Sequence, residues 1–158
     1  MKKILIVYYS RTGMTKKIAE SLGGRLGADL EEIISVKNRS GVLGYLLSGK
    51  EAARKEAAQI QPAFRNAADY DLVIIGTPVW GWNISSPMRA YLQQNIGKLR
   101  KLALFCTMGG SGDKQSFEEM EKICGLKSAA QISFLTKEVQ AGAGQEKLDK
   151  FIGDMSGV

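Results

Sequence analysis

The sequence contains no histidine and only two cysteines among its 158 residues. Because histidine is the commonest general base and the commonest metal ligand, its absence disfavours a hydrolase triad and a zinc site. The cysteines, Cys106 and Cys124, do not form a CxxC motif. Cys106 lies in an apolar run, so we interpret it as a small buried hydrophobic residue. A redox pair with Cys124 is the alternative.

Long hydrophobic runs are also missing. No run approaches the ~20 apolar residues that a membrane span needs, and the apolar run that follows Met1 is too short for a signal peptide. The sequence therefore predicts a cytoplasmic protein with no membrane partner. Its length predicts a single domain over residues 1–158. Its 44% hydrophobic and 24% charged residues are typical of a soluble globular protein.

Positive charge is abundant, with a formal net charge of +6. Residues 37–65 contain two acidic residues, Glu51 and Glu56, and six basic ones: Lys37, Arg39, Lys50, Arg54, Lys55 and Arg65. A solvated basic face is the simplest interpretation. The alternatives are an acidic protein partner and the extra phosphate of NADPH. Nucleic acid is not predicted as a partner, because no base-stacking aromatic series and no nucleic-acid motif accompany the charge.

Apolar runs alternate with segments of helical period along the whole chain. The runs predict five buried strands at residues 2–9, 29–36, 72–76, 102–107 and 130–135. Between and after them we predict helices at residues 14–26, 87–96, 113–123 and 144–155, with Ser86 as the N-cap and Pro87 at the first position of the second of these. This alternation predicts an α/β fold, in which helices cover both faces of a five-stranded parallel sheet of order 2-1-3-4-5.

The segment Gly41–Gln61 is longer than a plain crossover requires. Its apolar residues at helical spacing predict the crossover helix between the second and third strands, with an irregular start. Two short helices or a mobile flap are the alternatives, because glycine and serine interrupt the pattern. Tyr45 and Leu46 are candidates to lie over a bound ligand or in a subunit contact.

An unusual loop, Ser10–Thr15, follows the first predicted strand and opens a helix. It combines three hydroxyl side chains with Gly13, which permits a tight turn and close backbone approach. Helix N-termini present free N–H groups to anions, so the loop is a candidate phosphate site. An ordinary capped helix uses the same residue types. The spacing matches neither GxxxxGK[ST] nor GxGxxG, which disfavours ATP or GTP hydrolysis and a Rossmann dinucleotide site.

Two further loops follow the third and fourth predicted strands. The segment 77–87 carries Trp80 and Trp82, which suit stacking on a flat ring better than core packing, together with Gly81 and Asn83. The segment 107–113 has three glycines in four positions, which indicates close backbone approach or mobility. Ligands of such sheets bind beyond the carboxyl ends of the strands, so we expect all three loops to form one site.

In these three loops the chain resembles the flavodoxin family. Ser10–Thr15 matches the S-x-T-G-x-T phosphate loop of that family, with Met14 where Asn is often found, and the two later segments resemble its flavin loops. The resemblance implies a flavodoxin-like three-layer sandwich that binds flavin mononucleotide (FMN). It implies these cofactor-binding residues: Ser10, Arg11, Thr12, Gly13, Met14, Thr15, Thr77, Pro78, Val79, Trp80, Gly81, Trp82, Asn83, Thr107, Met108, Gly109, Gly110 and Gly112.

The resemblance implies a flavodoxin-type electron-transfer protein whose partners are a reductase and an acceptor protein. Two departures matter: electron-carrier flavodoxins are usually strongly acidic, and they often place a tyrosine in the third loop. The alternative is an FMN-dependent NAD(P)H:quinone-type oxidoreductase, because a glycine-rich third loop leaves open space over the flavin ring. A non-flavin interaction domain is a third hypothesis. No catalytic side chain and no metal are predicted.

Overall fold

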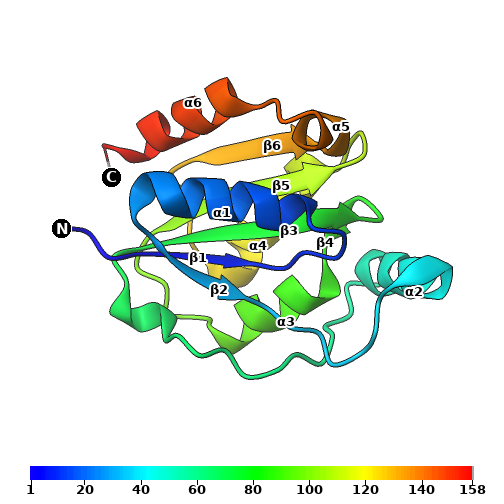
Figure 1. Ribbon diagram of the computed structural model, residues 1–158. Helices are drawn as coiled ribbons and strands as arrows, with labels where there is room; N and C mark the ends of the chain where they lie inside the picture. Colours follow the sequence, from blue (N-terminus) through cyan, green and yellow to red (C-terminus); the bar gives the residue numbers. More distant parts are fainter. Residues whose placement is uncertain (158) are drawn as a thin grey trace.

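The computed structural model describes residues 1–157, which form a parallel sheet between layers of helices (Figure 1). The five parallel strands pair in the order β2-β1-β3-β5-β6, and a short strand β4 pairs antiparallel with the end of β3. The strands are β1 (Ile4–Tyr8), β2 (Asp29–Glu32), β3 (Leu72–Trp80), β4 (Asn83–Ile84), β5 (Leu102–Met108) and β6 (Gln131–Leu135). Counted over the parallel strands alone, this is the predicted order 2-1-3-4-5.

Helices cover both faces of the sheet, as the alternation of strands and helices predicts. The side chains of α1, α5 and α6 pack on one face, and those of α3 and α4 pack on the other. The helix α2 lies beside the carboxyl edge of the sheet instead (Figure 1). The helices are α1 (Met14–Leu26), α2 (Gly41–Ala53), α3 (Ser86–Gln94), α4 (Asp113–Cys124), α5 (Thr136–Gln140) and α6 (Gln145–Met155), with a single 3-10 turn at Ala67–Asp69.

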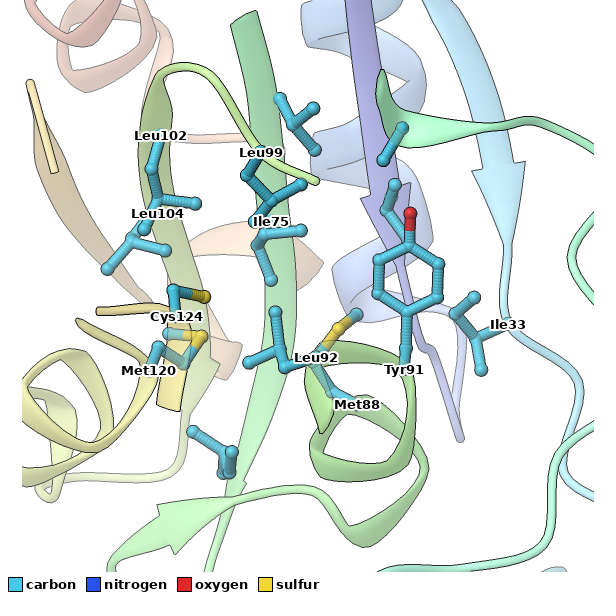
Figure 2. Packing of buried hydrophobic residues seen from close by; sticks show 14 of the residues in the cluster. Ile33, Ile75, Met88, Tyr91, Leu92, Leu99, Leu102, Leu104, Met120 and Cys124 are labelled. Carbon is cyan, nitrogen blue, oxygen red and sulfur yellow. The ribbon is translucent and has the colours of Figure 1, made fainter. Parts of the chain in front are cut away.

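The central strands are apolar on both sides because each face of the sheet is buried. In β1, Leu5 and Val7 join the core under α3 and α4, whereas Ile6 and Tyr8 join the core under α1 and α6. This alternation is the two-residue period of a strand covered on both faces. Figure 2 shows the first of these cores, where Tyr91 from α3 lies among aliphatic and sulfur-containing side chains.

The third strand is longer than predicted. We expected it to end at Gly76 and expected Thr77–Trp80 to be loop, but β3 continues through Trp80. The continuation pairs with β4 across a two-residue turn, in which Gly81 has φ 54° and Trp82 has φ 60°. Positive φ at both central residues is the hairpin turn that matches strand twist. The extra length therefore comes from a hairpin. Its turn residues, a glycine followed by a tryptophan, do not form one of the sequences that predict such a turn.

Other boundaries differ by smaller amounts. Ser85, rather than Ser86, is the N-cap of α3, since its hydroxyl accepts a hydrogen bond from the N–H of Met88. The second strand ends at Glu32, four residues before the predicted end, and an isolated antiparallel bridge between Ser35 and Ile60 follows it. The segment 41–61 forms one continuous helix, α2, followed by an irregular stretch, so the two-helix alternative is wrong.

No helix within residues 1–157 is both long enough and apolar enough to cross a membrane.

Candidate cofactor-binding site

The three loops singled out in the sequence meet at one edge of the sheet. They follow β1, β3 and β5, which are adjacent in the sheet. Thr15 and Thr107 join the first and third loops through a hydrogen bond of 2.8 Å between their hydroxyl oxygens. The indole N–H of Trp82 donates to the hydroxyl of Ser111 at 3.1 Å and so joins the second loop to the third. The structure thus brings the predicted segments into direct contact.

Close approach also explains one glycine of the third loop. Gly112 has φ 108°, and a Cβ atom there would lie 2.7 Å from Cγ1 of Val79. Neither the conformation nor the space admits a side chain. The hairpin and the third loop can therefore touch only because residue 112 is glycine.

The loop Ser10–Thr15 has the features of an anion site. Gly13 is the N-cap of α1 with φ 93°, and the first turn, Met14–Lys17, contains two lysines and no carboxylate. The hydroxyl of Ser10 accepts hydrogen bonds from the N–H groups of Gly13 at 3.1 Å and Lys16 at 3.2 Å. The N–H groups that begin a helix have no intrahelical partner and carry the positive end of its dipole. These residues fit a phosphate dianion.

Arg11 turns away from the helix start. Its Nε donates to the carbonyl of Arg39 at 2.9 Å, and its Nη2 donates to the carbonyl of Gly41 at 3.1 Å. The guanidinium carbon lies 5.5 Å from the ring centre of Tyr45. Arg11 therefore ties the candidate phosphate loop to the start of α2.

Three predicted site residues, Thr15, Thr77 and Thr107, are buried. The hydroxyl of Thr77 accepts a hydrogen bond from the N–H of Ser85 at 3.1 Å and lies 3.0 Å from the Ser85 hydroxyl. Thr15 and Thr107 bond to each other. Thr15 and Thr107 thus hold two loops together, whereas Thr77 holds the hairpin to the start of α3. Direct contact of the three residues with a cofactor stays a prediction.

The two tryptophans of the hairpin have different surroundings. Trp80 is half-buried, with its ring edge-on to Tyr9 at a centroid distance of 5.4 Å. Trp82 is 66% exposed. A Cβ added to Gly109 or to Gly110 would meet nothing within 4 Å among the described residues. The hairpin thus offers aromatic surface next to an open glycine turn.

The remaining predicted residues of these loops differ in exposure and bonding. The side-chain oxygen of Asn83 accepts hydrogen bonds from the N–H of Ile84 and from Arg89, and the carbonyl of Met108 accepts one from Thr136. Pro78 is half-buried and Thr12 is exposed.

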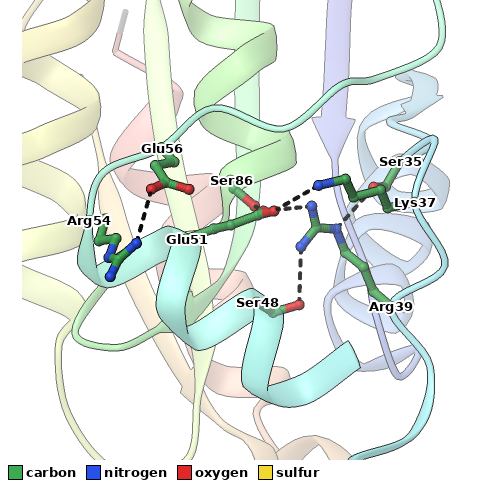
Figure 3. A network of polar contacts seen from close by, with 8 residues as sticks. All are labelled: Ser35, Lys37, Arg39, Ser48, Glu51, Arg54, Glu56 and Ser86. Atoms are coloured by element: carbon green, nitrogen blue, oxygen red, sulfur yellow. Dashed lines mark hydrogen bonds and ion pairs between the residues drawn. The ribbon is translucent and has the colours of Figure 1, made fainter. Parts of the chain in front are cut away.

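The sequence analysis did not select Arg39 as a site residue, yet this buried arginine is a centre of polar contacts (Figure 3). Arg39 donates to Ser35 at 2.9 Å, to Ser48 at 3.3 Å and to the carboxylate of Glu51 at 2.6 Å. Its guanidinium carbon lies 5.6 Å from the ring centre of Trp80. Arg39 therefore links α2 to the hairpin, while its own carbonyl holds Arg11.

The carboxylate of Glu51 is the second centre of this network. Burial alone would raise the pKa of Glu51, but hydrogen bonds from Ser86 and Arg39 and the charges of Arg39 and Lys37 outweigh it, so the pKa is lowered. Glu51 is thus ionised at neutral pH. The hydroxyl of Ser86, at the start of α3, donates to it at 2.6 Å. In the sequence, the helical spacing of Gly44, Ser48 and Glu51 could have predicted that this small and polar face of α2 is buried.

The basic stretch is largely neutralised by this and other ion pairs. Five of its six cations lie within 4 Å of a carboxylate: Lys37 and Arg39 with Glu51, Arg54 with Glu56, Lys55 with Glu119, and Arg65 with Asp29. Within residues 1–157, Lys50 is the one cation of the stretch without such a pair. The stretch is therefore not a continuous free basic face.

A cavity of about 520 Å³ lies between α2 and the hairpin. Its walls include Tyr45, Leu46 and Lys50 from α2, together with Trp80 and Trp82 from the hairpin. Gly110 and Ser111 of the third loop complete it. The volume lies in the range that holds a small organic ligand.

The two cysteines are both free and buried. Burial raises the pKa of Cys124 to about 11, and burial also raises the pKa of Cys106. Both thiols are therefore protonated at neutral pH. This agrees with the interpretation of Cys106 as a buried hydrophobic residue.

Comparison with known proteins supports the same class. The flavodoxin family model matches residues 3–153, so the chain belongs to the flavodoxin family. The predicted family is thereby confirmed. The cofactor of the protein is FMN, as predicted.

Three solved structures with a similar fold share 20–25% of their residues with this chain. A flavoprotein from Lactobacillus acidophilus NCFM, in complex with FMN, is 25% identical with a TM-score of 0.74, over 89% of this chain and 98% of that one. A candidate flavoprotein from Bacteroides eggerthii DSM 20697 is also 25% identical, with a TM-score of 0.70, over 96% of this chain and 99% of that one. A candidate flavoprotein from Bacteroides uniformis ATCC 8492 is 20% identical, with a TM-score of 0.76, over 96% and 98%.

Proposed function

We propose that the protein binds FMN at the meeting point of its three loops and transfers electrons between partner proteins. The observation that carries the proposal is the contact between the loops that follow β1, β3 and β5, above all the Thr15–Thr107 hydrogen bond. Membership of the flavodoxin family and the likeness to the FMN-containing flavoprotein of Lactobacillus acidophilus support it.

Each loop has a separate task in this proposal. Ser10, Thr12 and the N–H groups that begin α1 would hold the phosphate, for which the carboxylate-free first turn is suited. The hairpin with Trp80 and the glycine turn at Gly109 would orient the flavin ring and shield it from water. The bound FMN supplies the redox chemistry, so the chain needs no acid–base side chain of its own.

The partners in this proposal are proteins, a reductase and an acceptor. The net charge of +6 favours partners with acidic surfaces.

A second candidate function is an FMN-dependent NAD(P)H oxidoreductase. The cavity of about 520 Å³ favours it, because one of its walls is formed by α2, which lies outside the three FMN loops and could contact a second molecule. Among the described residues, Lys50 is the one cation of the basic stretch that has no carboxylate partner. Its ammonium could therefore bind an anionic group of that second molecule.

Steady-state NADPH oxidation by the purified, FMN-loaded protein separates the two candidates. If the protein is a carrier, NADPH is oxidised only after a flavodoxin reductase is added, since the carrier receives its electrons from that reductase. Rapid oxidation by the protein alone, with a quinone as acceptor, would contradict the carrier function and favour the oxidoreductase.

A further inference from the structure

A buried arginine of α3, Arg89, connects the hairpin to the helix α4. It is 3% exposed. Its Nη2 donates to the side-chain oxygen of Asn83 at 3.2 Å, and its Nη1 donates to the carboxylate of Glu119, in α4, at 2.7 Å. A guanidinium holds its donors in one rigid plane, so a single side chain can bridge two acceptors in a fixed geometry. Arg89 thus ties the strand β4 of the hairpin to α4.

Asn83 is the residue that directly follows the hairpin turn. It is paired with Trp80 across the hairpin. Its side-chain oxygen also accepts a hydrogen bond from the N–H of Ile84 at 2.8 Å. Because Arg89 carries donors only, it can hold the oxygen of this amide but not the nitrogen. The orientation of the Asn83 side chain is therefore fixed from outside the hairpin.

The turn that Asn83 follows has a conformation that needs support. Trp82 has φ 60°, and large side chains rarely adopt this left-handed region. Such a conformation persists where the surrounding contacts impose it. The indole of Trp82 is held by Ser111, and the next residue, Asn83, is held by Arg89. Arg89 is thus one of the contacts that keep the turn in place.

Glu119 keeps Arg89 in this position. Its side chain is 13% exposed, and it also accepts a hydrogen bond from Lys55, which follows α2, at 3.3 Å. Burial alone would raise the pKa of Glu119, but the hydrogen bonds and charges of Arg89 and Lys55 outweigh it, so the pKa is lowered. Glu119 is therefore ionised at neutral pH and pairs with the guanidinium.

The bonding of Arg89 is incomplete. Its Nε is buried and has no hydrogen-bond partner among the described residues. A buried donor without a partner destabilises a fold, and a buried ion pair is itself weak evidence for stability. Stability alone therefore does not account for a charged side chain at this position, whereas its grip on the hairpin does.

We infer that Arg89 is a positioning residue for the flavin: through Asn83 it fixes the hairpin turn, and it thereby sets the relative affinity of the site for oxidised and reduced FMN. Glu119 holds Arg89 in place. The inference rests on the proposed function, because the hairpin is one of the three loops assigned to FMN. It goes further by naming two residues, outside those loops, that tune the reduction potential.

A double-mutant cycle with Arg89→Met and Asn83→Ala tests this inference on the FMN-loaded protein. Each single variant should change the ratio of the affinities for oxidised and reduced FMN at least about fivefold, which is a shift of about 20 mV for a two-electron couple. Because Arg89 acts through Asn83, the double variant should show the shift of one single variant, not the sum of two. Potentiometric titration measures all three shifts.

Two carboxylates of α4 provide a matched control. Glu119 and Glu121 are similarly buried, with side chains 13% and 11% exposed, but Glu121 bonds to residues that lie outside the hairpin. Glu119→Ala should shift the potential in the same direction as Arg89→Met. Glu121→Ala should destabilise the fold and leave the potential unchanged, because loss of stability by itself does not favour one redox state.

Arg89→Lys serves if Arg89→Met does not fold, as judged by circular dichroism. It retains the charge but loses the planar pair of donors, so it should also shift the potential at least about fivefold in the affinity ratio.

Three results would each overturn the inference: additive shifts in the cycle, an unchanged potential in the folded Arg89 variants, or an equal shift in Glu121→Ala. Titration of the parent protein with FMN separates this failure from that of the proposed function. If the parent binds FMN and the Arg89 variants keep its potential, only the positioning role is wrong. If the parent does not bind FMN, the proposed function and the positioning role both fail.

Discussion

Arg39 is the residue on which most contacts around the candidate site converge. It is buried, forms an ion pair with Glu51, bonds to two serines and lies over the ring of Trp80. Its counterpart Arg54 is also basic and also forms an ion pair, with Glu56, but that pair is exposed and 3.9 Å long. The two arginines therefore separate the effect of a buried pair from that of a surface pair.

Replacement of Arg39 by methionine should lower the free energy of unfolding by about 3 kcal/mol, because it leaves the buried Glu51 carboxylate without its main partner. Replacement of Arg54 by methionine should change it by less than about 1 kcal/mol. Urea denaturation followed by circular dichroism measures both. Similar small losses in the two variants would show that the buried network does not stabilise the fold.

Trp80 is the tryptophan with the better position to contact a flavin, because it is half-buried against Tyr9 and held by Arg39. Trp80→Ala should weaken FMN binding by about 1 kcal/mol, the value of one stacking contact, and should also shift the flavin reduction potential. Fluorescence titration and a potentiometric titration measure the two effects. If neither changes, Trp80 is a core residue only.

At the scale of elements, the end of α4 is tied to the start of β6 by one carboxylate. Glu121 accepts hydrogen bonds from the N–H and hydroxyl of Ser128, from Lys127 and from Gln131. Burial alone would raise the pKa of Glu121, but the hydrogen bonds from Ser128 and Lys127 and the charge of Lys127 lower it from 4.5 to about 2.

The lowered pKa predicts a defined acid sensitivity. Because the folded pKa lies below the unfolded one, the stabilisation by Glu121 is fully present above pH 5 and is lost as the pH falls from 4.5 toward 2. Glu121→Gln should lower the free energy of unfolding by about 2 kcal/mol at pH 7 and should flatten its decrease in that acid range. A parallel pH dependence in variant and parent would contradict the assignment.

The elements that the sequence predicts well are those with a local cause. The buried strand β1 and the helix α1, which begins at Met14 directly after Gly13, are both properties of contiguous residues, and both are found as predicted. The extension of β3 depends on a hairpin whose turn places Trp82 at φ 60°, a conformation for which tryptophan carries no preference. The orientation of α2 depends on Arg39 and Glu51, which meet only in three dimensions.

At the scale of the whole molecule, the strand order of the sheet is the observation on which the proposed function depends. The order β2-β1-β3-β5-β6 places the carboxyl ends of β1, β3 and β5 side by side, so three loops that are far apart in the sequence form one site. Composition predicts the charge of this molecule but not its distribution. The six basic residues of segment 37–65 suggest a basic face, yet five of them have carboxylate partners from elsewhere in the chain or from the segment itself.

The most direct test of the FMN site compares FMN with riboflavin, which lacks the phosphate, by quenching of flavin fluorescence on the cofactor-free protein. We expect FMN to bind one per chain and riboflavin to bind at least about tenfold more weakly, because the start of α1 supplies charge-assisted hydrogen bonds only to the phosphate. Thr12→Glu should abolish the difference by repelling that phosphate. Equal binding of FMN and riboflavin to the parent protein, or unchanged FMN binding by the variant, would contradict the account.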